Sequence, residues 1–505
     1  MKFLFLSFLA GLAGACGFQP LALWPLILLS LVGLLWLVEQ APSLGSALAR
    51  GWWFGLGNFM LGLNWIATAF TFQAAMPAWL GWIAVILLSC YLAIYPATAV
   101  GLAWRYGRSN PLALVLWLAA AWIVTEWLRA SLFTGFAWNP VGVALIDVPG
   151  VAGLSRFVGT YGLSGAALMI AGIVFLLWRR RWKPAAMVAT AIAAGTLLAI
   201  PRQAPPKPAD APPLRIVQPN IGQEEKWKEG FAERNLARLG ALSNTSRREP
   251  RLLLWPEAAV TEPLQDARRG SAYQDDVRGV RRAVRQMLAP GDLLLTGGIT
   301  VGSEDGVTAS SATNSVFAID GSGRIVARYD KAHLVPYGEY LPARPILSAI
   351  GLSRLAPGDV DFESGPGPRT LDLPLVGKTG FQLCYEIIFS GEVVDRADRP
   401  DFLFNPSNDA WFGAWGPPQH LAQARLRALE EGLPVLRSTP TGISAAVDAD
   451  GRLIASIGLG EAGVIDIGLP PSRPPTLFAR GGNLLPLLFA FLLAGIAIAV
   501  RRKAG

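Results

Sequence analysis

The sequence has 505 residues, of which 52% are hydrophobic and only 16% are charged. An ordinary soluble domain has about 25% charged residues, so this composition excludes a wholly soluble protein and indicates membrane segments joined to a soluble part. The net charge of +8 does not indicate nucleic-acid binding, because the basic clusters flank apolar runs and no aromatic platform accompanies them. Three cysteines exclude a disulfide framework, and with only two histidines, His333 and His420, we expect neither a metal site nor a cofactor.

Eight apolar runs are long enough to cross a bilayer, which takes about 20 helical residues. We expect transmembrane helices near residues 3–18, 20–38, 52–72, 78–101, 112–132, 160–178, 184–200 and 484–500. Pro20 and Pro25 predict that the first apolar stretch is a hairpin of two helices. The alternative, a lipoprotein signal peptide ending near Cys16, is disfavoured because the apolar stretch is too long for a signal core.

Basic residues fall on alternate connections between these runs. They are Arg50, Arg105 with Arg108, the cluster at 179–183 and the C-terminal cluster at 501–503. The positive-inside rule places this set in the cytoplasm. Residues 201–483 then lie outside the cytoplasmic (inner) membrane, which in a Gram-negative cell is the periplasm.

Four polar side chains lie at or near membrane depth, where each is costly unless it is paired or faces a cavity: Asn58, Asn64, Glu126 and Arg129. Glu126 and Arg129 are three residues apart on one helix face. They either neutralise each other as a structural pair or contribute to a pocket for a lipid headgroup.

Residues 201–213 contain six prolines and predict a stiff linker that leaves the membrane. Beyond it, short β-forming runs alternate with helical patterns, which indicates one layered α/β domain. The strands are expected near 214–218, 251–255, 292–296, 314–319, 324–329, 380–388, 401–404, 434–437, 443–448 and 463–467. The helices are expected near 224–242, 275–288 and 418–431.

The predicted organisation therefore has five parts. They are a seven-helix membrane domain at 1–200, the linker at 201–213, the α/β domain at 214–469, a return linker at 470–483, and an eighth transmembrane helix with a basic tail at 484–505.

Three chemically useful side chains lie within or shortly after predicted strands. Glu257 follows the run Leu252-Leu253-Leu254-Trp255-Pro256 and is placed to act as a general base. Lys331 can stabilise an oxyanion, and Cys384 can act as a nucleophile. Taken singly, a loop glutamate, a surface lysine and an inert core cysteine are the commoner interpretations. We expect His333 to be a packing residue.

Taken together, the order Glu257, Lys331, Cys384 resembles the Glu-Lys-Cys triad of the nitrilase superfamily. The chain also has Trp-Pro-Glu at 255–257, Lys-Ala-His-Leu-Val-Pro-Tyr-Gly-Glu at 331–339, Cys-Tyr-Glu at 384–386 and Ser-Asn-Asp-Ala-Trp-Phe at 407–412. With eight spans around one such domain, it resembles the apolipoprotein N-acyltransferase family. The resemblance implies a multi-pass helical membrane domain joined to an extracytoplasmic nitrilase-like α-β-β-α sandwich.

The resemblance also implies roles for individual residues. Glu257 matches the family's base, Lys331 its oxyanion-stabilising lysine and Cys384 its nucleophile. The supporting residues it implies are Glu339, Tyr385, Glu386 and, in a substrate-facing loop, Trp227. Trp411 is expected to wall the site or to meet lipid. One departure is Ala258, where the family often has threonine or serine.

The implied activity is transfer of an acyl chain from the sn-1 position of a phospholipid, through a thioester on Cys384, to the α-amino group of an apolipoprotein's N-terminal diacylglyceryl-cysteine. The partners are then a phospholipid and a diacylated apolipoprotein in the bacterial inner membrane, and we expect a monomer. The apolar segment 341–355, with Ile346, Leu347, Ile350 and Leu352, forms either a lid or a packed loop. The alternative functions are a membrane-tethered nitrilase-type amidase and, from another class, a transporter or receptor without chemistry.

Overall fold

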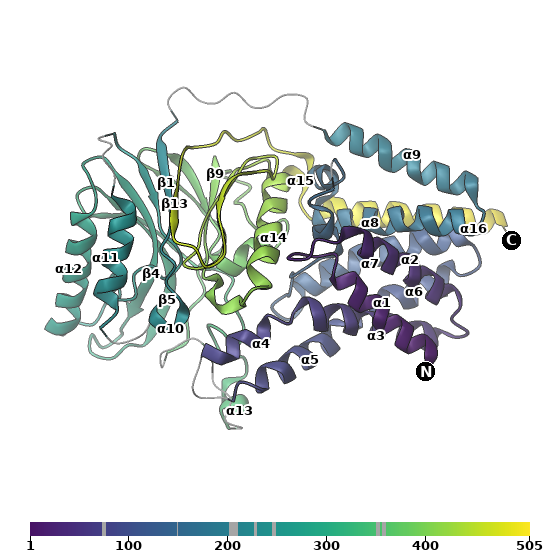
Figure 1. Ribbon diagram of the computed structural model, residues 1–505, viewed down its shortest axis with the longest axis horizontal. Helices are drawn as coiled ribbons and strands as arrows, with labels where there is room; N and C mark the ends of the chain where they lie inside the picture. Colours follow the sequence, from purple (N-terminus) through teal and green to yellow (C-terminus); the bar gives the residue numbers. More distant parts are fainter. Residues whose placement is uncertain are drawn as a thin grey trace.

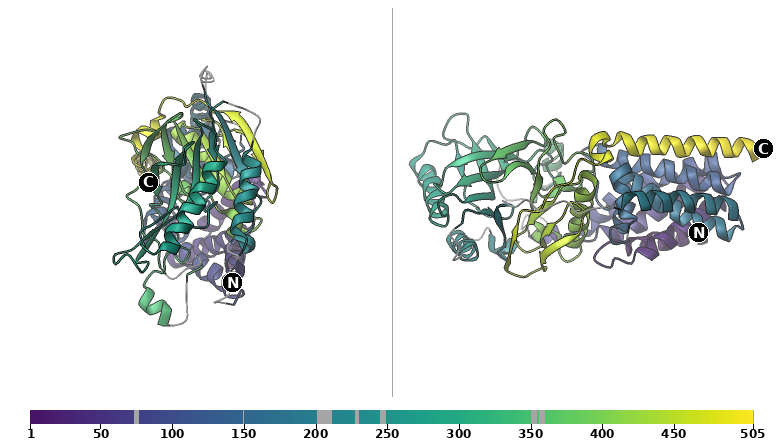
Figure 2. Two further views of the ribbon diagram at one scale, coloured as in Figure 1. Left: turned by 90° about the vertical axis from the view of Figure 1, so that its left-hand side faces the viewer. Right: turned by 90° about the horizontal axis from the view of Figure 1, so that it is seen from above.

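The computed structural model has a helical bundle at one end of an elongated molecule and an α/β domain at the other (Figures 1 and 2). It describes residues 1–72, 77–148, 150–200, 211–226, 230–244, 249–349, 354–355 and 360–504. The bundle is built from both ends of the chain, because α16 (Leu484–Ala504) runs along the helices of the N-terminal part. The α/β domain is therefore an insert that is tethered to the bundle on both sides.

The bundle consists of apolar helices packed on one another. They are α1 (Lys2–Ala15), α2 (Trp24–Glu39), α3 (Leu44–Gly62), α5 (Leu80–Leu92), α6 (Ile94–Gly107), α7 (Pro111–Ser131), α8 (Ser155–Trp178), α9 (Trp182–Ala199) and α16. The predicted hairpin at the N-terminus is confirmed, with α1 packed on α2 and Pro25 in the first turn of α2.

Several of these helices are long and apolar enough to cross a membrane. Among the described residues five segments qualify: Leu80–Gly107, Pro111–Ser131, Ala152–Trp178, Trp182–Ala199 and Leu484–Arg502. Helices α1 and α2 are apolar but shorter. The count of eight spans therefore stays a prediction.

The span predicted at 52–72 is wrong. Its helix, α3, begins earlier, at Leu44, because the Ser43 hydroxyl accepts a hydrogen bond from the Ser46 N–H and caps the helix. It ends at Gly62, and the chain continues as the short helices α4 (Ile66–Ala69) and η1 (Phe70–Phe72). Helix α4 contacts the α/β domain, so this part of the predicted span is not a continuous membrane crossing.

Arg50 lies inside α3 and not in a loop, which also corrects the prediction. Its side chain is buried, donates to the Leu37 carbonyl at the end of α2 and lies 4.4 Å from the ring centre of Phe3. A carbonyl at a helix C-terminus carries partial negative charge and lacks an intrahelical partner, so it stabilises a buried cation. Arg50 is therefore used in helix packing and does not mark a cytoplasmic loop.

The α/β domain contains two sheets. The first has the order β13-β1-β2-β4-β5-β6, with β3 paired to β4, and the second has the order β12-β11-β10-β9-β8-β7. The strands of the first sheet are β1 (Pro213–Gln218), β2 (Leu252–Leu254), β3 (Gln265–Asp266), β4 (Leu293–Gly302), β5 (Ser311–Asp320), β6 (Ile325–Asp330) and β13 (Gly463–Gly468). Those of the second are β7 (Thr370–Leu373), β8 (Gly377–Phe381), β9 (Phe402–Pro406), β10 (Val435–Ser438), β11 (Ser444–Val447) and β12 (Leu453–Ile457).

The two sheets pack face to face between layers of helices, as Figure 1 shows. Alternate residues of β2 serve the two faces of its sheet: Leu252 and Leu254 pack between the sheets, whereas Leu253 packs under α11 (Ala232–Ser243) and α12 (Ser271–Gln286). On the opposite side, α14 (Gly416–Glu431) covers the second sheet and also packs on α8 of the bundle. The α-β-β-α order of layers agrees with the predicted sandwich.

Two predicted elements differ from those observed, and three observed strands were not predicted. The strand expected at 380–388 ends at Phe381, and residues Cys384–Ile388 form a 3₁₀ helix, η4. The helix expected at 224–242 is divided into α10 (Gln223–Lys226) and α11. Strands β3, β7 and β12 were not expected; β3 has only two residues, and the outward-facing positions of β12 are mostly exposed. Such short or edge strands lack the apolar pattern that marks a buried one.

Candidate active site

Glu257, Lys331 and Cys384 come together at the ends of three strands. Glu257 lies shortly after β2, Lys331 directly follows β6, and Cys384 follows β8 of the second sheet. All three side chains are buried, and Cys384 interacts electrostatically with both of the others. Residues far apart in sequence thus form one compact cluster at the boundary between the two sheets.

Glu257 has one anchored and one unpartnered carboxylate oxygen. Its Oε1 accepts a hydrogen bond of 2.8 Å from Asn314 Nδ2 on β5 and lies 3.8 Å from Lys331 Nζ. Its Oε2 is buried and has no hydrogen-bond partner among the described residues. A buried acceptor without a partner is costly, so this oxygen is well suited to receive a proton from a reacting group.

Lys331 is held in its charged form. Its Nζ donates to Glu339 Oε1 at 2.9 Å and lies 2.9 Å from Glu339 Oε2. Burial disfavours the charge, but the carboxylates of Glu339 and Glu257 outweigh it and raise the pKa of Lys331. A permanent cation here can stabilise negative charge but cannot act as a base.

Cys384 lies on a sharp change of backbone direction. Its φ of +54° is rarely adopted by residues other than glycine, and it starts the 3₁₀ helix η4 directly after the strand region. Burial, followed by the negative charge of Glu257, raises the pKa of the thiol well above its usual value, while Lys331 opposes the shift. The resting group is therefore a thiol, and its activation needs a base.

Glu386 anchors this turn to the Lys331 segment. Its Oε2 accepts from the Leu383 N–H at 2.6 Å, and its Oε1 accepts from the Ala332 N–H at 2.7 Å and the His333 N–H at 3.1 Å. The hydroxyl of Tyr329 donates to the same carboxylate at 2.9 Å. Burial raises the pKa of Glu386, and the backbone N–H groups counteract that effect. Glu386 therefore holds the backbone next to Cys384 against the backbone that follows Lys331.

Other predicted residues face the bundle. The Tyr385 hydroxyl donates to the Gly135 carbonyl at 3.3 Å, and His333 Nε2 lies 2.8 Å from the Thr134 carbonyl while its ring stacks on Phe389. His333 is thus a packing residue, as expected. Trp411 contacts the ring of Phe72, with 5.9 Å between centroids. Trp227 lies outside the described residues.

A metal centre receives no support from the described part of the chain, in which no group of three His, Cys, Asp or Glu side chains is arranged to hold an ion.

Ala258, the departure from the family pattern, has φ of +46° and directly follows Glu257. The orientation of Glu257 therefore depends on Asn314 and not on a hydroxyl at position 258.

The whole chain matches proteins of one family. Residues 10–173 match the model of the apolipoprotein N-acyltransferase N-terminal domain, and residues 214–473 match that of the carbon-nitrogen hydrolases. An apolipoprotein N-acyltransferase of Rhodopseudomonas palustris is 34% identical, covering 99% of this chain and 95% of its own length. One of Bradyrhizobium diazoefficiens is 36% identical, covering 98% and 94%.

The chain belongs to the apolipoprotein N-acyltransferase family. Among solved structures, a Saccharomyces cerevisiae member of branch 10 of the nitrilase superfamily matches 53% of this chain and 93% of its own, with 18% identity and a TM-score of 0.38. The family assignment rests on the two domain matches and on the full-length relatives.

The acyltransferase site contains three residues that the sequence did not single out. Asn314 Nδ2 donates to both Glu257 and Glu339 at 2.8 Å. The buried Lys226 donates to the Glu257 carbonyl at 3.0 Å, and burial lowers its pKa to about 8. His420 lies 3.0 Å from the Cys384 carbonyl. None has a local sequence signal, since each acts through a partner distant in the chain.

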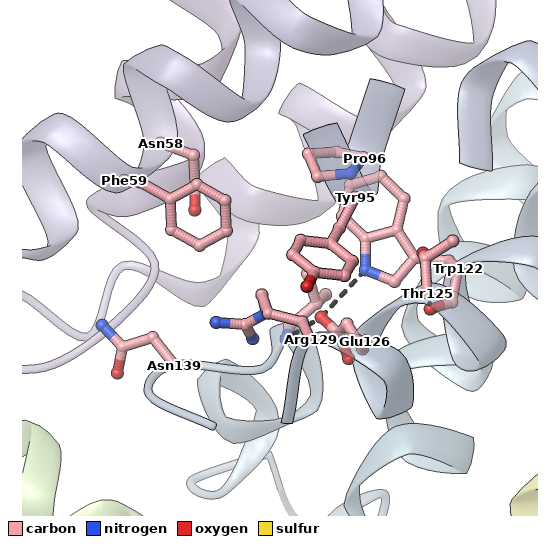
Figure 3. Close-up of a pocket in the computed structure, with 10 residues that line it drawn as sticks. Asn58, Phe59, Tyr95, Pro96, Trp122, Thr125, Glu126, Arg129 and Asn139 are labelled. Carbon is pink, nitrogen blue, oxygen red and sulfur yellow. Dashed lines mark hydrogen bonds between the residues drawn. The ribbon is translucent and has the colours of Figure 1, made fainter. Parts of the chain in front are cut away.

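Glu126 and Arg129, the two charged residues of α7, border one small cavity (Figure 3) and interact electrostatically with each other. Both predicted roles, a structural pair and a pocket for a lipid headgroup, therefore stay predictions. Glu126 Oε1 accepts from the Val141 N–H at 2.9 Å, and Arg129 Nη1 donates to the Trp138 carbonyl at 2.8 Å. Together they fix the loop that follows α7, and that loop contacts the catalytic domain.

Proposed function

We propose that this acyltransferase moves an acyl chain from the sn-1 position of a phospholipid, through a thioester on Cys384, to the α-amino group of the N-terminal diacylglyceryl-cysteine of an apolipoprotein. The observation that carries the proposal is the buried cluster in which a thiol, a free carboxylate oxygen of Glu257 and the cation of Lys331 are brought together. The thiol form of Cys384 and the charged form of Lys331 are the protonation states that this chemistry requires.

The first half-reaction forms the thioester. Glu257 Oε2 takes the proton of the Cys384 thiol while the sulfur attacks the ester carbonyl carbon. The resulting oxyanion is stabilised by Lys331 Nζ and by the backbone N–H of Tyr385. Collapse of this intermediate breaks the bond to the glycerol oxygen, which receives the proton from Glu257 and leaves as lysophospholipid.

The second half-reaction returns the enzyme to its starting state. The neutral α-amino group of the acceptor attacks the thioester carbonyl, and Glu257 takes the amine proton. The carbon–sulfur bond then breaks, an amide is formed, and the Cys384 thiolate recovers the proton. The sequence is a ping-pong reaction, and ester, thioester and amide follow one another without a nucleotide or a cofactor.

The membrane bundle fits an enzyme whose two substrates are both anchored in lipid. Its apolar helices suit an inner-membrane protein. We place the catalytic domain on the periplasmic side because the basic residues that remain at helix ends or in connections, at 105–108, 179–183 and 501–503, fall on the other side. Helix α13 (Arg344–Ala349) in the proposed lid has no buried residue, and Ile346 is 69% exposed. An unburied apolar helix fits a lid in contact with lipid better than a packed loop. Two other lid positions, Ile350 and Leu352, lie outside the described residues.

Cys384→Ala gives the decisive test. Purified wild type, mixed with phospholipid in detergent, should gain the mass of one acyl chain on Cys384, and addition of a diacylated lipopeptide should remove that mass and produce triacylated peptide. The variant should do neither. Transfer by Cys384→Ala would refute the proposal, and release of free fatty acid or of ammonia from small amides by wild type would favour the amidase alternative.

A further inference from the structure

His420 lies directly behind the nucleophile. It is fully buried in α14, and its Nε2 is 3.0 Å from the carbonyl oxygen of Cys384. A carbonyl oxygen can only accept, so Nε2 must carry a hydrogen and donate it whether the ring is neutral or charged. The histidine thus makes a defined contact with the backbone of the residue whose side chain reacts.

A buried network fixes the orientation of this ring. Asp409 Oδ1 lies 3.0 Å from His420 Nδ1, and Arg437 Nη2 lies 3.0 Å from the same nitrogen. Arg437 in turn donates to both oxygens of Asp409 at 2.7 Å. All three side chains are fully buried, so neither the ring nor its partners can exchange these contacts for water.

The contact determines the direction of one N–H group. The Cys384 carbonyl and the Tyr385 N–H belong to the same planar trans peptide, in which they point in opposite directions. Holding the carbonyl against His420 therefore turns the Tyr385 N–H away from α14. Among the described residues this N–H has no acceptor outside its own 3₁₀ turn, so it is available to a substrate.

Cys384 needs such a restraint because of its backbone conformation. A φ of +54° is unfavourable for a residue with a side chain and persists only where the surroundings enforce it. Helix α14 also holds the segment further along, where Arg427 donates to the Ile388 carbonyl at 3.1 Å and Ser390 donates to Glu430 at 2.8 Å. Of these contacts, only that of His420 is made to the nucleophile itself.

We propose that His420 is a positioning residue, which orients the Cys384–Tyr385 peptide so that the Tyr385 N–H forms part of the oxyanion hole. The hydrogen bond on the carbonyl also polarises the peptide and makes its N–H a stronger donor. The inference rests on the proposed function, since it assumes that Cys384 is acylated. His420 itself does not touch the substrate and exchanges no proton with it.

The test compares two substitutions of His420 whose side-chain amides differ in length by one methylene group. In His420→Gln the side-chain amide nitrogen can replace Nε2, whereas in His420→Asn it is one methylene too short. We expect His420→Asn to slow acylation of Cys384 by phospholipid about 10- to 100-fold with little change in KM. That is less than the roughly 10²–10³-fold lost when an oxyanion-hole donor is removed altogether. His420→Gln should stay within about fivefold of wild type.

A spectroscopic readout separates positioning from a general structural defect. With a phospholipid carrying ¹³C at the sn-1 carbonyl, difference infrared spectra of the trapped thioester report hydrogen bonding to that carbonyl. The stretch should move to higher frequency in His420→Asn and remain near the wild-type value in His420→Gln. Ser390→Ala, which loses another contact to α14, serves as the control and should match wild type in rate and frequency.

Three outcomes would overturn the inference. They are wild-type acylation and carbonyl frequency in His420→Asn, an equal loss in Gln and Asn variants, or failure of both to fold as judged by melting in detergent. Failure of the proposed function would look different, because wild type itself would then form no acyl-enzyme or Cys384→Ala would still transfer.

Discussion

Replacement of Glu257 by glutamine tests the assignment of the base. Glutamine keeps an oxygen that can accept from Asn314 Nδ2 at the position of Oε1, so the local fold should persist. It places an amide group where Oε2 has no partner among the described residues, and this group cannot take a proton. The variant therefore removes proton transfer while leaving the shape of the site almost unchanged.

The expected loss follows from the state of the thiol. A thiol with a pKa of 9.0 is about 3% ionised at pH 7.5, and burial raises the pKa of Cys384 well above that value. An enzyme that depends on spontaneous ionisation should therefore be slower by more than about 30-fold. General-base catalysis is typically worth about 10²–10⁴-fold, and we expect Glu257→Gln to fall in that range.

The assay is the rate of acyl-enzyme formation, followed by intact-protein mass spectrometry after mixing with phospholipid in detergent. The rate of Glu257→Gln should rise about tenfold per pH unit between pH 7 and 9 as thiolate forms, whereas wild type should not show this rise. The exposed Glu233 of α11 provides the control substitution, Glu233→Gln, with no expected effect. Wild-type rates in Glu257→Gln at pH 7.5 would refute the reasoning.

Three further substitutions address the surroundings of the triad. Lys226 is buried with a pKa of about 8 against an ordinary 10.5, so the unfolded chain binds more protons between these values and stability rises with pH there. Relative to Lys226→Met, wild type should gain about 3 kcal/mol between pH 7.5 and 10.5 in melting experiments; parallel profiles would contradict this. Glu386→Gln turns an amide toward backbone N–H groups and should cost about 1–3 kcal/mol of stability as well as acylation rate, whereas Glu257→Gln should lower only the rate. Asn314→Asp replaces the amide that donates to Glu257 and Glu339 by a third carboxylate, which should lower both stability and the acylation rate; wild-type values of both would rule out their contact.

Of the three strands that precede the triad residues, β2 was the most clearly predictable because it is an unbroken apolar run. Its residues 252–254 are all buried, with successive side chains serving opposite faces of one sheet. The acid at the end of such a run could therefore be placed near a cleft without the structure. Hydrophobic periodicity gives no reason to connect three separate strand ends. The order Glu257, Lys331, Cys384 provided a chemical reason.

The conformation at Cys384 was not predictable in the same way. The run from Phe381 to Ile388 is rich in β-formers, and its apolar residues are compatible with a buried strand as well as with a buried 3₁₀ turn. The strand is followed by a local capping contact, from the Leu383 N–H to the Glu386 carboxylate, and by a tertiary contact, from His420 to the Cys384 carbonyl. The tertiary contact has no local signature. Asn314 was not predicted for the same reason, because nothing in the sequence of β5 indicates that its amide bridges two glutamates.

The bundle takes part in the catalytic site as well as holding the domain near lipid. Glu126 and Arg129 of α7 bind the backbone of the loop after that helix. This loop offers the Gly135 carbonyl to Tyr385 and the indole of Trp138 to Gln419 on α14, where its ring also lies 5.2 Å from that of His420. The helix that holds the nucleophile is thus itself held by the membrane domain. It follows that the nitrilase-like domain, cut free of its helices, should lose the geometry of Cys384 even if its two sheets still fold, because the contacts that fix α14 on its outer side would be replaced by water.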